Sequence, residues 1–365
     1  MAIITYDIDP DGDICLVLKD PNSHSIVPIT GKRVKDNSND AFENLPLVGR
    51  YEVFNKAVKD ASVDAFGELP PVSDTDTTEV HMRVSSRHLI LASRIFHKML
   101  KGDWRESSSK NVVSGLWQIQ TSGWDAAALA IVLDVIHGRH RGIPTYTNLG
   151  LLTRIATIVD YYEFHESLQL MSDIWMTALR AVNAVPTKYC QSALLWLYTS
   201  WVFSERIVIS SITKMLLESS DGLSEIDSLD LPVGGIVDII KTKREELISK
   251  LINGLDDLRK TLTEENVCLR QSSDTICSAT MLGILMRETH KLKLLDPPLD
   301  PPYNGHSISS LKEKIANFPK PRQEFHNVNP YGAYSSDPCT VHSRMAIVFK
   351  EIDDDMESFD LTPHQ

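Results

Sequence analysis

The apolar positions between residues 79 and 100 change their spacing midway. Apolar residues first alternate with polar ones, as in a strand with one buried face: Val80, Met82 and Val84. They then follow the three- and four-residue spacing of a helix that faces a core: Ala92, Ile95, Phe96, Met99 and Leu100. Ser85 and Ser86 lie between the two patterns, and either hydroxyl can cap a helix start. This stretch therefore predicts a strand followed by two short helices.

Similar patterns predict the remaining elements. Residues 12–18 are apolar on both faces and predict a well-buried strand, and 116–120 predict another strand. Residues 143–145 predict a short extended segment around a proline, and Thr147 or Asn148 can cap the helix that follows. Helical spacing recurs along the rest of the chain, at 123–137, 148–162, 167–179, 193–201, 208–216, 237–262 and 279–293. Ser310 and Glu313 form a capping box for a last helix.

The longest of these helices, 237–262, allows two interpretations. Its apolar face runs from Ile240 to Leu262, and Lys241, Arg244 and Lys250 are predicted on the polar face. A coiled-coil dimer would use such a face, but the heptads are not sustained. The pattern therefore favours a helix packed on its own domain.

Composition narrows the class of protein. The chain has 365 residues, 42% of them apolar and 24% charged, which suits two soluble globular domains of ordinary size. A formal net charge of −12 argues against direct binding to nucleic acid. No apolar run is as long as a membrane span, and residues 1–7 lack the features of a signal peptide. Five scattered cysteines and the lack of glycosylation sequons favour an intracellular location, in the cytoplasm, the nucleus or both.

No motif indicates an enzyme or a cofactor site. The sequence has no G-x-S-x-G, no phosphate-binding glycine loop, no H-E-x-x-H and no C-x-x-C, although a triad of distant residues stays open. Zinc-ligand types do occur in the second half, at Cys268, Cys277, His290, Cys339 and His342. Only Cys339 and His342 approach the close spacing of a structural zinc site. We therefore expect no catalytic residue, no cofactor and no metal.

Two clusters of residues resemble the BTB/POZ family, and more closely its fungal branch. The first cluster comprises Val84, Ser85, Ser86, Leu89, Ala92, Ser93, Ile95, Phe96, Met99 and Leu100. The second comprises Ile136, His137, Gly138, Pro144, Leu151, Leu152, Val159, Asp160 and Tyr162. The strand predicted at 12–18 also resembles the family's first strand, which is led by an Asp at the place of Asp13.

The resemblance implies an α/β (α+β) fold, in which a BTB/POZ domain is followed by an all-α C-terminal domain. The first domain, 1–185, would hold a small mixed sheet flanked by helices, and 186–365 would be a helical extension with Pro-rich loops. The family joins its first two strands by a short hairpin, so an insertion of about residues 20–78 must separate them here, before a core at 79–180. Residues 60–79 contain six acidic side chains and no Lys or Arg, a composition typical of a mobile loop.

The resemblance also implies a function in protein association. We expect a non-enzymatic scaffold or adaptor, and in particular a substrate adaptor for a cullin-type ubiquitin ligase. In cullin-recruiting members, an aromatic or apolar residue, any residue and a Glu contact the cullin, and Trp104, Arg105 and Glu106 occupy that place. In the alternative interpretation Trp104 merely covers the sheet and Glu106 is solvated.

A second function stays open as an alternative. BTB proteins also include transcription and chromatin regulators that act through protein partners. No zinc finger or basic region is recognisable in the sequence, so any contact with DNA would pass through a third protein.

Self-association is the remaining expectation. The family's dimers use apolar contacts of the first helix and a charged pocket, in which the Asp of the first strand faces a His directly after the second strand. Asp13 is present, but Ser85 takes the place of that His. A homodimer would then depend on apolar side chains, and the candidates are Val84, Leu89, Ile90 and Leu91.

Overall fold

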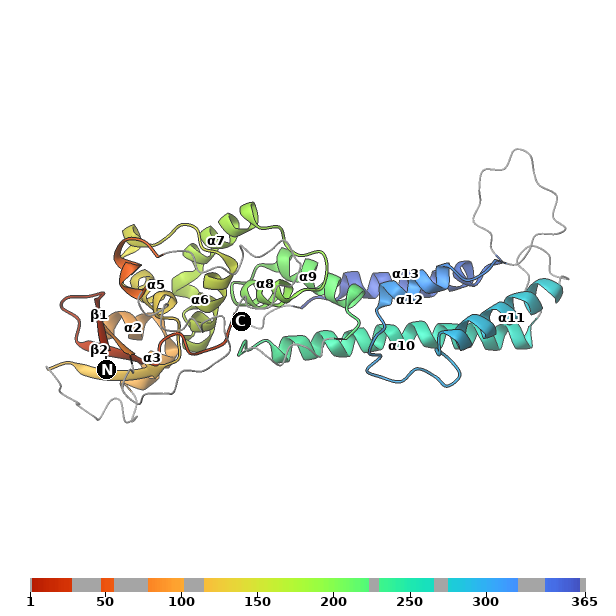
Figure 1. Ribbon diagram of the computed structural model, residues 1–365, viewed down its shortest axis with the longest axis horizontal. Coiled ribbons are helices and arrows are strands. Elements are labelled where there is room, and N and C mark those ends of the chain that lie inside the picture. The colour runs from red at the N-terminus through yellow and green to blue at the C-terminus, as the bar shows by residue number, and fades with distance from the viewer. Residues whose placement is uncertain are drawn as a thin grey trace, which may run out of the picture.

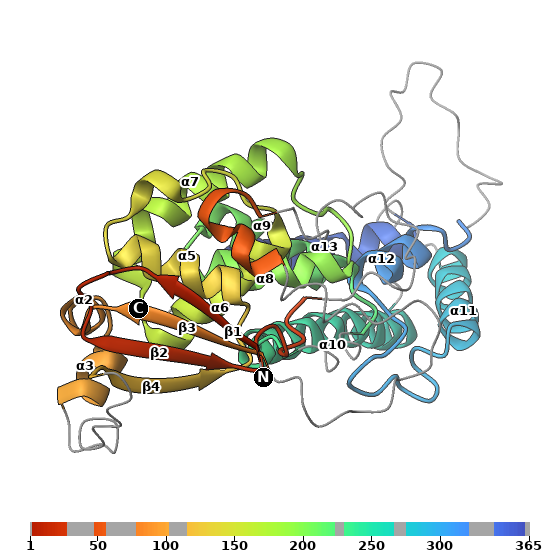
Figure 2. The same cartoon turned by 60° about the vertical axis from the view of Figure 1, so that its left-hand side comes forward.

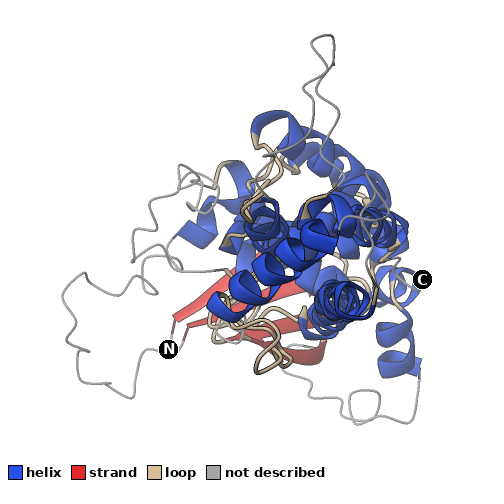
Figure 3. Cartoon of the chain, turned by 90° about the vertical axis from the view of Figure 1, so that its right-hand side faces the viewer, coloured by secondary structure: helices blue, strands red, loops and turns tan. Residues whose placement is uncertain are grey.

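The computed structural model describes residues 2–27, 47–55, 78–101, 115–222, 230–265, 275–320 and 339–361. The chain forms a head, from strand β1 to helix α9, and an elongated arm built from helices α10 to α13 (Figure 1). The fold is mixed α and β, with a small sheet and many helices, as the sequence predicts at this coarse level. Figure 3 shows the strands gathered in one layer beside the helices.

The sheet has four strands in the order β1-β3-β2-β4. Strand β2 (Ile14–Lys19) pairs antiparallel with β3 (Thr78–Val84) and parallel with β4 (Trp117–Ser122). The strands predicted at 12–18, 79–84 and 116–120 are thereby confirmed. Strand β1 (Ala2–Asp7), parallel to β3 at one edge of the sheet, was not predicted.

Burial follows the hydrophobic pattern in the central strands. In β3 the alternate residues Val80, Met82 and Val84 are buried, and their neighbours are partly exposed. Strand β2 lies between two partners and buries residues of both faces, including Leu16 and Val17. Such a strand is continuously apolar because neither face reaches water.

Two short helices follow β3, as predicted. Helix α2 (Ser86–Ala92) ends at Ser93, and α3 (Arg94–Lys101) begins two residues later than the Ala92 start of the pattern. Ser85 occupies the N-cap position of α2, but its side chain makes no capping hydrogen bond. The hydroxyl of Ser93 instead accepts a hydrogen bond from the amide of Phe96 at 3.0 Å. Ser93 therefore ends α2 and also caps the start of α3.

Three helices complete the part of the head that precedes residue 185. Helix α5 (Ala126–Ile136) is buried along nearly its whole length, α6 (Leu149–Tyr162) starts at Asn148 as predicted, and α7 (His165–Val182) covers them. Asn148 Oδ1 accepts from the amide of Leu151 at 2.8 Å. The segment 143–145 forms no strand with the described residues, although Ile143 is extended. Its Pro144 carbonyl accepts instead from the indole N–H of Trp175, at 2.7 Å.

Helices α8 (Gln191–Val202) and α9 (Arg206–Ser219) connect the head to the arm. Thr199 and Tyr198 of α8 form hydrogen bonds with Thr153 and Asp160 of α6, at 3.0 and 3.1 Å. Helix α9 packs on α8 and also on α10, α12 and α13. The hydrophobic core is therefore continuous across the boundary that we predict at 185/186.

The arm is built on α10 (Gly234–Glu264), a helix of 31 residues. It packs along α11 (Thr275–Lys291) and α13 (Val341–Ser358), and α12 (Ile308–Ala316) lies near its middle (Figure 1). The capping box of α12 consists of Ser307 and Ser310, three residues before the predicted one. No helix in the described part of the chain is both long enough and apolar enough to cross a membrane.

Candidate functional site

The junction between β3 and α2 is the place where the resemblance puts a charged pocket. Asp13 lies there, and both of its carboxylate oxygens accept hydrogen bonds from Ser86: Oδ1 from the amide at 2.7 Å and Oδ2 from the hydroxyl at 2.6 Å. Burial raises the pKa of Asp13, but these hydrogen bonds and the charge of Arg87 outweigh it and hold the pKa below its ordinary value. The carboxylate thus caps the N-terminus of α2 from a neighbouring segment.

A histidine does reach this junction, but it comes from α5. Nε2 of His137 accepts from the amide of Ser85 at 3.0 Å, and its Nδ1 donates to the carbonyl of Leu133 at 2.7 Å. The ring of His88 stacks on it, with the ring centroids 4.7 Å apart. Burial lowers the pKa of His137, which keeps the imidazole neutral. Asp13 and His137 therefore both bind the start of α2 and leave no free nucleophile or base.

The four candidates for self-association lie at different depths. Val84 and Leu89 are fully buried in the core, and Ile90 is half-buried against it. Leu91 is 88% exposed, which makes its side chain the most accessible of the large apolar ones in the described residues. Of the predicted set, only Leu91 and the outer part of Ile90 can contact another protein without rearrangement of the head.

The other predicted partner-binding residues lie outside the described part of the chain. These are Trp104 and Glu106. Most of the insertion predicted at 20–78 also lies outside the described residues, and so does Cys268, one of the zinc-ligand types named above. Among the described residues, no group of three His, Cys, Asp or Glu side chains could hold a metal ion.

A buried polar cluster in the head escaped the sequence analysis. Asp134 of α5 is fully buried, and its Oδ2 accepts from the hydroxyls of Tyr6 at 2.7 Å and Tyr51 at 2.9 Å. Arg50 lies with Nη1 3.2 Å from the other carboxylate oxygen and stacks over the ring of Tyr6. Burial, with the nearby carboxylate, raises the pKa of both tyrosines, so both stay protonated as donors.

This cluster joins three distant segments: β1, the 3₁₀ helix η2 (Gly49–Phe54) and α5. Asp134 is the single charged residue in the apolar sequence of α5, a signal that sequence reasoning could have used. Its partners could not have been found in this way, because they are 83 and 128 residues away. Because the buried carboxylate of Asp134 pairs with the partly exposed Arg50 and accepts from both tyrosines, the cluster is suited to fixing η2 against β1 and α5.

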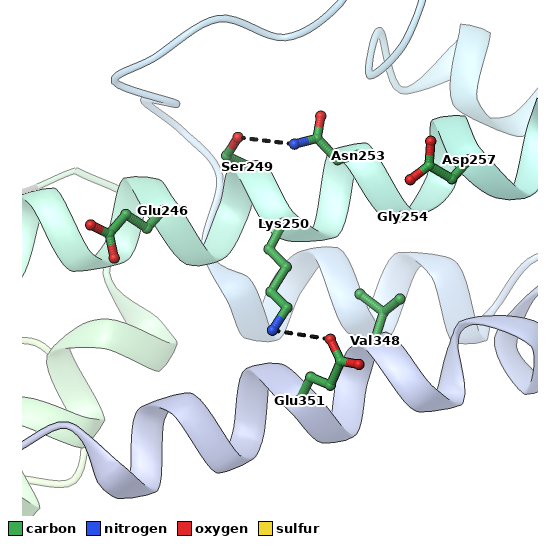
Figure 4. Close-up of a pocket in the computed structure, with 8 residues that line it drawn as sticks. All are labelled: Glu246, Ser249, Lys250, Asn253, Gly254, Asp257, Val348 and Glu351. Atoms are coloured by element: carbon green, nitrogen blue, oxygen red, sulfur yellow. Dashed lines mark hydrogen bonds and ion pairs between the residues drawn. The ribbon is translucent and has the colours of Figure 1, made fainter.

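The arm carries a groove of about 480 Å³ between α10 and α13 (Figure 4). Its lining is mostly polar: Glu246, Ser249, Lys250, Asn253, Gly254, Asp257, Val348 and Glu351. Lys250 Nζ lies 3.0 Å from Glu351 and 3.1 Å from Asp355, so its charge is already paired. Because the lysine that lines the groove is already paired with two carboxylates, the groove offers an anionic substrate no free cation from this side chain.

Comparisons with known proteins do not assign the chain to a family. The chain matches no family model, and a search of curated proteins finds no similar sequence.

Proposed function

We propose that the protein is a non-enzymatic protein–protein interaction scaffold, with a BTB/POZ-like head and a helical arm. One observation carries the proposal. The head exposes Leu91, and the arm, built on the 31-residue helix α10, extends well beyond the head (Figure 1). An apolar side chain that the folded head leaves exposed is available to be buried by a partner. Two separate surfaces on one chain allow two partners to be held at the same time.

The order of elements around the sheet supports the BTB/POZ part of the proposal. Strand β2 pairs with β3 despite the long insertion, two short helices follow, and β4 returns to the other side of β2. This is the arrangement that the resemblance implies for residues 12–120. The fold class alone does not assign a function, which is why the proposal depends on surfaces.

The specific form of the proposal is a substrate adaptor for a cullin-type ubiquitin ligase. Trp104 and Glu106 lie in the sequence between α3 and β4, outside the described residues. We propose that they contact the cullin, while the arm or another surface holds the client.

Co-purification from cell extract tests this. The tagged full chain is expected to carry a cullin with it, and the double variant Trp104→Ala, Glu106→Ala is expected to lose it. Leu170→Ala on α7, an exposed leucine on another surface, serves as the control and should retain the cullin. An unmutated protein that brings down no cullin would rule out the adaptor role, whereas the wider scaffold role would need another partner to be found by mass spectrometry.

A further inference from the structure

The segment that forms α2 and α3 has an unusual charge for this chain. Residues 86–101 contain four Lys or Arg side chains, two His and no Asp or Glu, although the whole chain has a formal net charge of −12. The four cations are Arg87, Arg94, Lys98 and Lys101, and all four are exposed. None of them forms an ion pair within the part of the chain that the structure describes.

The cations lie on the same two helices as an exposed apolar side chain. Leu91 lies on α2 with 88% of its surface exposed, one helical turn after Arg87, and Ile90, Ile95 and Met99 of the two helices are half-buried against the core. Helices α2 and α3 pack against each other and lie beside the strands, at the left edge of the head in Figure 2. We call Leu91 and the four cations the basic–apolar surface.

The acidic group that the structure places at the start of α2 is already engaged. Asp13 lies at the N-terminus of α2, and both of its oxygens are engaged by Ser86. It is attracted by Arg87, but Arg94, Lys98 and Lys101 are on the following helix. A binding partner could therefore gain Coulomb energy with these three cations as well as apolar contact with Leu91.

A second copy of the chain does not fit the basic–apolar surface in a symmetric dimer. A two-fold axis places the same patch on both sides of the interface, so cations would face cations. Two unit charges 4 Å apart repel by about 1 kcal/mol in bulk water and by about 4 kcal/mol at the effective dielectric near a protein surface. A partner of opposite charge avoids this cost.

We propose that the basic–apolar surface docks an acidic protein segment, in which one aliphatic or aromatic side chain packs on Leu91 between flanking Asp or Glu residues. The inference deepens the proposed scaffold function by giving the chemistry of one partner, and it does not involve the cullin. The apolar contact excludes water at the centre, and the carboxylates pair with the cations at the rim.

The test uses the purified full chain and a fluorescent synthetic peptide that has Phe-Leu between Glu-rich flanks. Fluorescence anisotropy is expected to show binding that weakens strongly between about 0.01 M and about 1 M salt, as the Debye length falls from about 30 Å to about 3 Å. Leu91→Asp and the double variant Arg94→Glu, Lys98→Glu are each expected to weaken binding by about tenfold or more.

Two controls make the result specific. The charge-reversed double variant should bind a peptide in which Lys replaces every Glu, and this peptide should not bind the unmutated protein. Leu170→Asp introduces the same change at an exposed leucine of α7 and should leave binding unchanged. Thermal unfolding of each variant checks that the head is still folded.

Three outcomes would overturn the inference. One is no binding of the acidic peptide at low salt, and another is binding that the charge reversal leaves unchanged. The third is a dimer of the unmutated protein, measured by light scattering, that Leu91→Asp dissociates, because the occupant would then be a second copy. Each outcome is independent of cullin co-purification, so failure here and failure of the adaptor proposal can be told apart.

Discussion

Arg244 shows how much a single side chain can organise. It lies in α10, is only 3% exposed, and donates through Nε to Ser220 O and through Nη1 to Pro302 O, each at 3.0 Å. Its Nη2 also donates to the carbonyls of Tyr303 and His306. Burial lowers the pKa of this guanidinium, although Glu245 and Asp221 partly offset the effect. The arginine thereby ties the end of α9 and the loop before α12 to the middle of the arm.

We therefore expect Arg244→Ala to lower the free energy of unfolding by about 3–5 kcal/mol, because the carbonyls lose their donors in a buried site. Arg244→Lys should recover only part of this loss, since an ammonium lacks the planar fork that reaches several carbonyls at once. Urea unfolding measures both. Lys241→Ala, on the same helix but exposed, is the control and should change stability by no more than about 0.5 kcal/mol. Equal effects of the two alanine variants would contradict this role for Arg244.

His137 provides a pH-dependent prediction at the residue scale. Its neutral ring accepts from the Ser85 amide, and burial and the nearby His88 lower its pKa, while the Leu133 carbonyl, Asp9 and Asp134 act in the opposite direction. The folded state thus binds fewer protons than the unfolded state, in which the pKa is about 6.5. The stability from this group is complete above about pH 6.5 and is lost as the pH falls below that value towards the lowered pKa.

Urea unfolding across pH 4.5 to 8, values chosen to bracket a normal histidine pKa of about 6.5, measures this loss. His137→Gln keeps an acceptor for Ser85 but does not titrate, so the difference in stability between it and the unmutated protein should depend on pH only below about 6.5. A stability difference that is constant with pH would show that His137 binds protons equally in the folded and unfolded states. Asp13 acts in a separate, lower window, because its pKa is lowered from a carboxylate value.

At the scale of elements, local periodicity predicted most of the fold and failed for specific physical reasons. The strands β2 and β3 and the helices α2, α3, α5, α6 and α7 bury one face or both, and the spacing of their apolar residues shows this in the sequence. Strand β1 is held by backbone pairing to residues 78–83 and buries only Tyr6. Its sequence therefore lacks the alternation of apolar and polar residues that would predict a strand. Periodicity also placed Arg244 on the polar face of α10, although the side chain is buried. The spacing of residues within one helix contains no information on the carbonyls of distant segments that accept from this arginine.

The site was less predictable than the fold. Asp13, which we predict as a self-association residue, lies at the β3–α2 junction, where its carboxylate accepts from Ser86; whether it contributes to self-association stays a prediction. Leu91 could be named from the pattern, whereas its exposure depends on which part of α2 is left uncovered by α3 and α5. Exposure and charge of a surface come from tertiary packing, so a sequence can list the side chains without showing which of them share a face.

The crossing of α10 and α13 permits a prediction about packing. A Cβ atom built on Gly254 would lie 3.0 Å from a methyl of Val348 and 3.1 Å from the terminal methyl of Met345. Gly254→Leu should therefore destabilise the protein by about 1–3 kcal/mol through overpacking, despite the better helix propensity of leucine. The matched control is Gly283→Ala on α11, where a Cβ meets nothing within 4 Å and stability should rise by about 0.5–1 kcal/mol. Thermal or urea unfolding of the two variants should show changes of opposite sign.

At the scale of the whole molecule, the structure raises the question of whether head and arm unfold separately. The two domains predicted from the sequence meet at 185/186, but α8 packs into α6 and α9 packs on helices of the arm. Ser25, beyond β2, and Asp230, just before α10, also exchange two hydrogen bonds, at 2.8 and 3.1 Å. These contacts favour one cooperative unit over two independent ones.

We therefore expect a substitution in the head to shift the unfolding of the arm as well. Asp134→Ala leaves the buried hydroxyls of Tyr6 and Tyr51 without their acceptor, and it should lower stability by about 2–4 kcal/mol in a single transition. Hydrogen exchange can follow amides of α5 and α10 separately in this variant. If the molecule is one cooperative unit, protection falls equally in both helices, because the slowest amides in each exchange through global unfolding. Loss of protection in α5 with α10 unchanged would show that the arm folds independently of the head.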